Sequence, residues 1–232
     1  MDLVSTDASI VLAVVAMCGG LAAGAVAIAL ARLIPPRMEV EPHIRPSWWW
    51  GAAVLAGGAY GWLVTRAVES WALLPAFLVF GAATLGIALI DLDHQLIPNR
   101  VLFPALGAGA ALLAIGSLVD GELGSLVRGL LGGAVYFLIL LVVGLIARGG
   151  FGMGDVKLAL LLGLFLGYLG WDILMIGTVL AVLLGGVASI LLLVFTSKGR
   201  DAKFAYGPYL VLGAWIALIW GEQLADWYLR AA

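Results

Sequence analysis

The sequence predicts an all-α polytopic membrane protein, a bundle of about eight transmembrane helices with its N-terminus outside. Of its 232 residues, 64% are hydrophobic and only 11% are charged, whereas a soluble domain carries about 25% charged residues. The mean hydropathy is +1.14, and apolar runs recur at about the 20 residues that a spanning helix needs. This composition leaves no room for a separate soluble domain, so we expect residues 1–232 to form a single domain embedded in the lipid bilayer.

The first four predicted helices are bounded by tryptophans and turn residues. The helix at 9–33 follows two acids and no Lys or Arg, so it lacks the positive n-region of a secretory signal and is expected to stay in place. The helix at 48–65 opens on three tryptophans and the helix at 71–91 opens on one, as an interfacial aromatic belt would require. Pro98 then breaks the chain before the helix at 101–119.

The last four predicted helices include a short one. The helix at 126–147 precedes a glycine-rich turn, and the helices at 172–196 and 206–225 are separated by a stretch that contains Gly199. The helix at 156–170 has only 15 residues and rises about 22 Å, less than the hydrocarbon core of about 30 Å. Either it fails to span, or the glycine-rich chain before it enters the membrane plane, where irregular backbone needs protein or water around it.

The distribution of positive charge favours one orientation of this bundle. With the N-terminus outside, the cytoplasmic segments hold nine Lys and Arg residues and the outside segments hold three, in keeping with the positive-inside rule. The acidic stretches around Asp91 and Asp155 then both lie on the cytoplasmic side.

Charge and cysteine content exclude several classes of protein. The formal net charge is −2 with no cluster of Lys or Arg, so we expect no nucleic acid partner. Cys18 is the only cysteine, which rules out an intrachain disulfide and a C-x-x-C zinc site. Glycine pairs at small-xxx-small spacing, Gly129/Gly133 and Gly163/Gly167, predict close helix packing within the chain, with a homodimer face as the lesser option.

Two aspartates at the ends of predicted helices are the strongest functional candidates. Asp91 closes the third helix and Asp155 opens the sixth. A carboxyl group near membrane depth is costly and points to function, and two at one site would share a proton, as in an aspartic protease. One carboxylate would then take a proton from water while its protonated partner polarises the scissile carbonyl.

The residues alone leave other interpretations open. Both acids could cap helices or line a juxtamembrane loop, and a multi-helix transporter or channel could use them as proton or ion sites. Asp91, Asp93 and His94 suggest a metal site, but no further His or Cys lies nearby in the sequence. We therefore expect neither a metal nor another cofactor.

Three stretches of the sequence stand out as motifs. Residues 91–99 are D-L-D-H-Q-L-I-P-N, residues 152–158 are G-M-G-D-V-K-L, and residues 204–210 are F-A-Y-G-P-Y-L. In this order they resemble the motifs of the type IV prepilin peptidase family. The first motif of the family is an Asp followed, after six residues, by Pro and then Asn or Asp. The second is a G-x-G-D signature, which the family shares with presenilin-type intramembrane aspartyl proteases. The third is an F-G-P-F-L stretch late in the chain. The resemblance covers roughly residues 70–215.

The resemblance implies a function and a set of site residues. It makes Asp91 and Asp155 the catalytic pair of an aspartic endopeptidase in the bacterial cytoplasmic membrane. Such an enzyme removes the short basic leader of type IV prepilin and pseudopilin precursors, just after a glycine, at the cytoplasmic face. Asp93 would then be a solvated loop acid, and Lys157 would either hold a carboxylate's charge or anchor the chain inside. The positions that match the supporting motifs are Pro98, Asn99, Gly152, Gly154, Lys157, Gly207 and Pro208.

One region departs from the bifunctional members of this family, which also methylate the new N-terminus with S-adenosylmethionine. Their first helix closes in G-S-F-L-N-V-V-I-x-R-L-P, and the cytoplasmic segment that follows often holds two C-x-x-C pairs. Here residues 24–37 keep an Arg and a Pro but contain no Asn, and the short loop at 34–47 contains no cysteine. We therefore expect a peptidase without a tetracysteine zinc site and without N-methylation.

Overall fold

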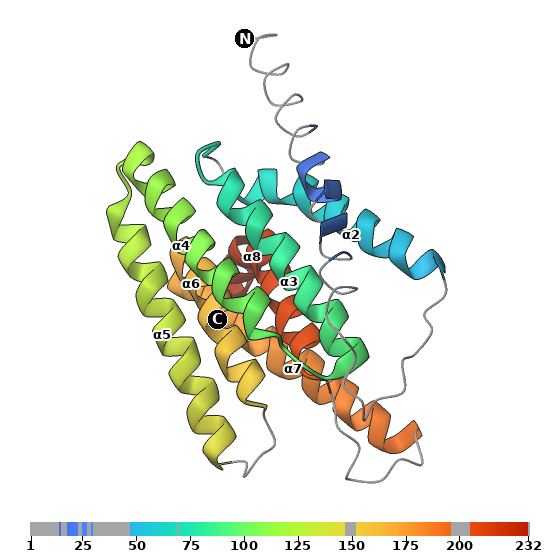
Figure 1. Ribbon diagram of the computed structural model, residues 1–232. Coiled ribbons are helices and arrows are strands. Elements are labelled where there is room, and N and C mark those ends of the chain that lie inside the picture. Colours follow the sequence, from blue (N-terminus) through green and yellow to red (C-terminus); the bar gives the residue numbers. More distant parts are fainter. Residues whose placement is uncertain are drawn as a thin grey trace.

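The computed structural model describes residues 14, 18–22, 25, 26, 29, 47–68, 70–146, 152–195 and 205–231. Within these residues every regular element is an α-helix, which confirms the predicted all-α fold, and the helices pack into one bundle (Figure 1). The helices with defined bounds are α2 (Ser47–Ala67), α3 (Leu74–His94), α4 (Asn99–Asp120), α5 (Leu123–Ile146), α6 (Met153–Leu169), α7 (Trp171–Phe195) and α8 (Gly207–Ala231).

The helices begin and end close to the predicted positions. Every bound of α2 to α7 lies within three residues of its prediction, and α8 extends six residues further, to Ala231. The predicted helix at 9–33 falls largely outside the described residues, although each described position between 14 and 29 is helical. The predicted loop at 34–47 also lies outside them, except for Ser47, where α2 begins.

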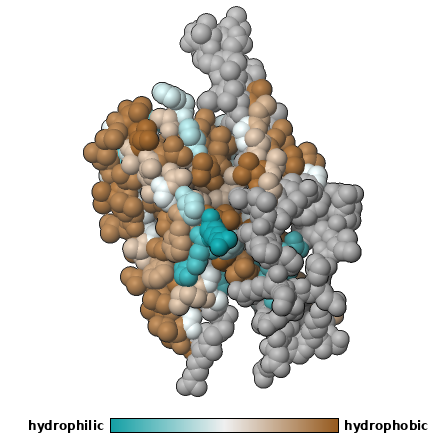
Figure 2. Space-filling view, viewed as in Figure 1, coloured by the Kyte–Doolittle hydropathy of each residue, from teal (hydrophilic) through white to brown (hydrophobic). Residues whose placement is uncertain are grey.

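Length and composition identify membrane spans among these helices. Helices α3, α4 and α5 and the segment Trp171–Leu191 of α7 are each long and apolar enough to cross a membrane. The surface over α4 and α5 is mostly apolar, interrupted by a small hydrophilic patch (Figure 2). Large apolar side chains such as Leu131, Leu138 and Val142 point outward from α5, which suits a surface that contacts lipid rather than water. The chain is therefore a polytopic membrane protein.

Helix α6 is short and lies inside the bundle. It has 17 residues and rises about 25 Å, so it remains shorter than the hydrocarbon core of about 30 Å. All residues from Leu161 to Tyr168 are buried, and α6 contacts α3, α4, α5, α7 and α8. Because the helix begins at Met153, three residues before the predicted start, Asp155 lies inside its first turn.

The most extensive helix contact among the described residues joins α5 to α6, which run side by side in Figure 1. A Cβ added at Gly163 would lie 2.6 Å from the carbonyl oxygen of Gly132 and 2.8 Å from Cα of Gly133. Only glycine permits backbones to approach this closely. The predicted small-residue pairs therefore pack against each other within the chain.

The end of α6 away from Asp155 is held by Arg128 of α5. Its Nε donates to the carbonyl oxygen of Gly167 (2.9 Å), and its Nη2 donates to those of Tyr168 (2.6 Å) and Leu169 (3.1 Å). A cation that binds the last carbonyls of a helix satisfies groups without intrahelical partners and interacts favourably with the helix dipole. The position of α6 along its axis is therefore fixed by packing against the neighbouring helices and by the Arg128 cap.

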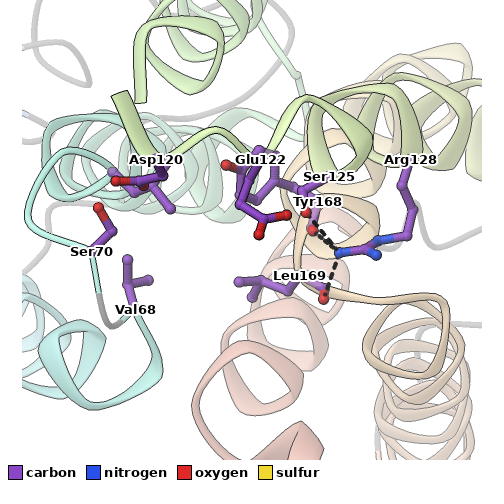
Figure 3. Close-up of a pocket in the computed structure, with 9 residues that line it drawn as sticks. Val68, Ser70, Asp120, Glu122, Ser125, Arg128, Tyr168 and Leu169 are labelled. Carbon is purple, nitrogen blue, oxygen red and sulfur yellow. Dashed lines mark hydrogen bonds between the residues drawn. The ribbon is translucent and has the colours of Figure 1, made fainter. Parts of the chain in front are cut away.

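A cavity of about 390 Å³, lined by both polar and apolar side chains, adjoins this cap, as the close-up in Figure 3 shows. Asp120, Glu122 and Ser125 line it together with Tyr168, whose hydroxyl lies 2.9 Å from Ser117 Oγ. Tyr168 is separated from Asp155 by about 20 Å along α6. This cavity therefore belongs to the end of the bundle opposite the two aspartates.

Helices α3 and α8 are joined by a partly buried polar contact. Trp215 Nε1 donates to Thr84 Oγ1 (3.0 Å), and Thr84 Oγ1 donates to the carbonyl oxygen of Phe80 (2.7 Å). The Trp215 ring also packs on Tyr60 of α2, with ring centroids 4.4 Å apart. Thr84 lies seven residues before Asp91 on α3, which is about two helical turns. The contact therefore fixes the middle of α3 against α8.

We predict that Gly163→Ala lowers the thermal unfolding midpoint of the purified protein in detergent, because the added methyl group must force α5 away from α6. Overpacking of this kind costs about 1–3 kcal/mol. Gly107→Ala is the matched control, since a Cβ at Gly107 of α4 meets no atom within 4 Å and alanine favours a helix. Circular dichroism melts of both variants test this, and a Gly163→Ala midpoint at or above that of Gly107→Ala contradicts it.

Candidate active site

Asp91 lies inside the last turn of α3 rather than at its end. The helix continues to His94 and stops where Gln95 adopts a left-handed conformation (φ 49°, ψ 44°), with Gln95 N donating to the carbonyl oxygen of Asp91 (2.8 Å). Asp91 is only 5% exposed. A carboxyl group with so little access to water requires hydrogen-bond donors from the protein.

The donor to Asp91 is the first residue of α8. Gly207 N donates to Asp91 Oδ2 (3.0 Å) across a separation of 116 residues. A Cβ at Gly207 would lie 2.7 Å from the same carboxyl oxygen, so only glycine allows this approach. Pro208 follows as the second residue of α8, where its missing N–H costs nothing because the first N–H groups of a helix have no intrahelical acceptor.

Asp155 occupies the first turn of α6 and has a similar environment. Gly152 N donates to Asp155 Oδ2 (3.2 Å), while Asp155 N donates to the carbonyl oxygen of Gly152 (3.0 Å). Asp155 is 8% exposed. The reciprocal pair closes the start of α6 as a capping box does, and it fixes the carboxyl group to the backbone of the G-x-G-D motif.

Ile97 connects the surroundings of the two aspartates. Its Cβ lies 3.1 Å from the position of a Cβ at Gly154, and its Cδ1 lies 3.3 Å from the position of a Cβ at Gly207. Ile97 therefore packs against the residue before Asp155 and against the donor to Asp91. The two carboxyl groups are also close enough to repel each other when both are charged. The structure thus brings the predicted pair to one buried site.

A second contact links the two acidic motifs. Lys157 Nζ donates to Asn99 Oδ1 (3.4 Å), so the second turn of α6 is tied to the first residue of α4. Pro98 precedes α4 in an extended conformation (ψ 123°), and its carbonyl oxygen accepts from the backbone N of Val101 and Leu102 (both 3.0 Å). Lys157 thus joins the motifs through an amide, a contact that neither sequence interpretation of this residue included.

The neighbours of Asp91 differ from their predicted setting. Asp93 and His94 belong to the last turn of α3 and are half-buried, so the prediction that Asp93 lies in a solvated loop is wrong. The helix runs three residues beyond the predicted end because Gln95, not Asp91, makes the helix-ending turn. Among the described residues, no group of three or more His, Cys, Asp or Glu side chains could hold a metal ion.

Sequence reasoning missed two residues that shape this site. Ile97 stands at one of the six positions that the first motif leaves unspecified, and only the fold places it between Gly154 and Gly207. Tyr206 precedes Gly207 and lies within electrostatic range of Asp155. Its aromatic side chain beside the Gly-Pro pair was the one available signal in the sequence.

Comparison with known proteins identifies the family. Residues 77–190 match the type IV leader peptidase family, and this segment contains both Asp91 and Asp155. No solved structure matches the chain.

Several curated relatives extend the match. The chain is 34% identical over 160 residues to a prepilin leader peptidase/N-methyltransferase of Stutzerimonas stutzeri, covering 68% of this chain and 53% of that protein. It is 34% identical over 163 residues to the protein of the same name from Bacillus subtilis (strain 168), covering 69% of this chain and 61% of that protein. The matches thus span little more than half the length of these relatives. With both acidic motifs inside the matched segment, the chain belongs to the type IV leader peptidase family.

Proposed function

We propose that this protein is a membrane aspartic endopeptidase that cleaves the leader from type IV prepilins or pseudopilins, with Asp91 and Asp155 as its catalytic pair. The observation that carries the proposal is that two buried carboxyl groups, from helices far apart in sequence, converge at one site. Each of them accepts a hydrogen bond from one backbone N–H. Family membership supports the reaction class, and it disfavours the transporter or channel that the residues alone left open.

The proposed chemistry requires one proton between the two acids. Two carboxyl groups that share a buried site do not both ionise readily, so one is a carboxylate and the other is protonated. The carboxylate accepts a proton from a water molecule, whose oxygen bonds to the carbonyl carbon of the scissile peptide. The protonated partner donates to the carbonyl oxygen, which gives a tetrahedral intermediate. Transfer of a proton to the peptide nitrogen then breaks the C–N bond and releases the leader.

The relatives support the proposed substrate class. Their names include prepilin leader peptidase, and we infer that this chain acts on precursors of the same kind, with a short basic leader followed by an apolar helix. An apolar substrate helix suits an enzyme that is itself embedded in a bilayer, because the helix and the enzyme can share the same apolar environment. We also propose that residues 1–232 act as one membrane-embedded unit.

The proposed location is the bacterial cytoplasmic membrane, with the aspartates facing the cytoplasm. The nine-to-three distribution of Lys and Arg supports this orientation. Asp91, the start of α4, Asp155 and the start of α8 share one end of the bundle, so a single orientation places all the motifs on one side.

We predict that Asp91→Asn and Asp155→Asn each reduce leader cleavage by about a hundredfold or more, because an amide can neither accept nor release the catalytic proton. The measurement is conversion of a co-expressed, tagged type IV prepilin precursor whose basic leader ends in glycine, scored by its shift on a gel. Asp93→Asn is the matched control and should cleave like wild type. Cleavage at the control level by either catalytic variant would sink the protease assignment.

We predict that the two ends of the bundle are labelled from opposite sides of the membrane. In a Cys18→Ser background, Glu122→Cys reports on the α4–α5 turn and Met153→Cys, at a residue 58% exposed, reports on the start of α6. A membrane-impermeant maleimide should label E122C in intact cells and should label M153C only after permeabilisation. The reverse pattern contradicts the cytoplasmic site.

We predict that the cleaved product keeps an unmethylated N-terminus. The chain has one cysteine, so it cannot form the tetracysteine zinc site often found in bifunctional members of the family. Mass spectrometry of pilin cleaved by the purified protein with S-adenosylmethionine present tests this. A product carrying one added methyl group overturns the peptidase-only interpretation and leaves the cleavage assignment intact.

A further inference from the structure

Tyr206 is joined by its own peptide bond to Gly207, the backbone donor to Asp91. It immediately precedes Gly207, and its carbonyl oxygen accepts the first hydrogen bonds of α8, from Tyr209 N (3.1 Å) and Leu210 N (3.2 Å). The peptide bond between Tyr206 and Gly207 carries the N–H that Asp91 Oδ2 accepts. Because that peptide is planar, any rotation of the Tyr206 backbone turns this N–H away from the carboxyl group.

The Tyr206 side chain is seated in a notch on α7. At Gly185, an added Cβ would overlap Cε2 of the Tyr206 ring and would lie 2.6 Å from Cζ. The Tyr206 hydroxyl donates to the carbonyl oxygen of Ala181 (3.2 Å), which lies one helical turn before Gly185. The ring is therefore held by shape at Gly185 and by a hydrogen bond at Ala181.

Helix α7 is a firm support for this contact because its backbone also touches α8 further along. A Cβ at Gly213 would lie 2.6 Å from Ala181 N and 2.8 Å from Ala181 Cα, and a Cβ at Gly177 would lie 3.2 Å from Ala217 Cβ. Gly177, Ala181 and Gly185 recur every four residues, on one face of α7. The Tyr206 contact is the last of this series, at the end nearest the aspartates.

Tyr206 also lies within electrostatic range of Asp155, the other half of the pair. The side chain is half-buried, and its hydrogen bond and its ring contact are both with α7. Tyr206 therefore adjoins the donor to one acid and lies within electrostatic range of the other.

We propose that Tyr206, seated in the Gly185 notch, is a positioning residue that aims the Gly207 N–H at Asp91 and so sets the geometry of the aspartate pair. The proposal rests on the proposed function, since it assigns a role in the same cleavage reaction. Tyr206 acts through Gly207 rather than on the substrate, so its effect falls on the chemical step. A displacement of about 1 Å in a reacting group can cost about a hundredfold in rate.

The notch provides a matched pair of substitutions for the test. Gly185→Ala fills the notch and displaces the ring, whereas a Cβ at the neighbouring Gly186 meets no atom within 4 Å. With the purified full-length protein in detergent and a prepilin precursor peptide as substrate, Gly185→Ala should lower kcat by about tenfold or more at nearly unchanged KM. Gly186→Ala should match wild type in both. Loss of kcat without a change in KM indicates an interaction needed only in the transition state.

Changes at Tyr206 separate positioning from a general loss of stability. Tyr206→Phe keeps the ring and should retain kcat within about fivefold, the contribution of one hydrogen bond. Tyr206→Leu leaves the notch unfilled and should lower kcat as much as Gly185→Ala does. In the double variant the added methyl group has no ring to displace, so its kcat should equal that of Tyr206→Leu alone, a non-additivity expected of contacting residues.

The outcomes distinguish this inference from the proposed function. Wild-type kcat in both Gly185→Ala and Tyr206→Leu, with Asp91→Asn and Asp155→Asn inactive, overturns the role of Tyr206 and leaves the protease assignment standing. Equal losses in Gly185→Ala and Gly186→Ala also overturn it, as does full additivity in the double variant. If Gly185→Ala does not insert, Tyr206→Leu compared with Tyr206→Phe decides the question. Cleavage by the aspartate variants would instead remove the proposed function itself.

Discussion

Two carboxyl groups buried at one end of a helical bundle set the main constraint on this structure. A buried carboxylate without hydrogen-bond donors is strongly destabilising, and backbone N–H groups within helices are already used. The free donors lie at helix starts, where the first N–H groups have no intrahelical acceptor. Asp91 receives one from Gly207 at the start of α8, and Asp155 receives one from Gly152 before α6. The site is therefore built where helices begin.

The glycines at this site are needed because neighbouring side chains approach their Cα atoms closely, as well as for their backbone freedom. At Gly207 a side chain would press on the Asp91 carboxyl group, and at Gly154 it would press on Ile97. The same requirement extends down the bundle, where Gly132 and Gly163 bring the backbones of α5 and α6 together. A membrane helix pair gains little from the hydrophobic effect, so such close packing supplies much of its stability. The glycines of the motif and those of the bundle thus answer one physical need.

The helices that carry the two aspartates are held in place by contacts that lie away from the site. Helix α6 carries Asp155 at one end and is capped by Arg128 at the other, although it is the shortest of the helices α2 to α8. Helix α3 is tied to α8 through Thr84 and Trp215. The acids sit near helix ends, and between them the apolar helices keep their backbone hydrogen bonds internal, as lipid requires.

The sequence by itself determined the helices and the two acids. Each apolar run must satisfy its backbone hydrogen bonds internally in lipid, so hydropathy alone located most helix bounds, and motif spacing singled out Asp91 and Asp155. Only the tertiary structure decided that α3 continues to His94, that Ile97 packs between the motifs and that Tyr206 sits in the Gly185 notch. These contacts join helices far apart in the chain, and they depend on packing that no local pattern encodes.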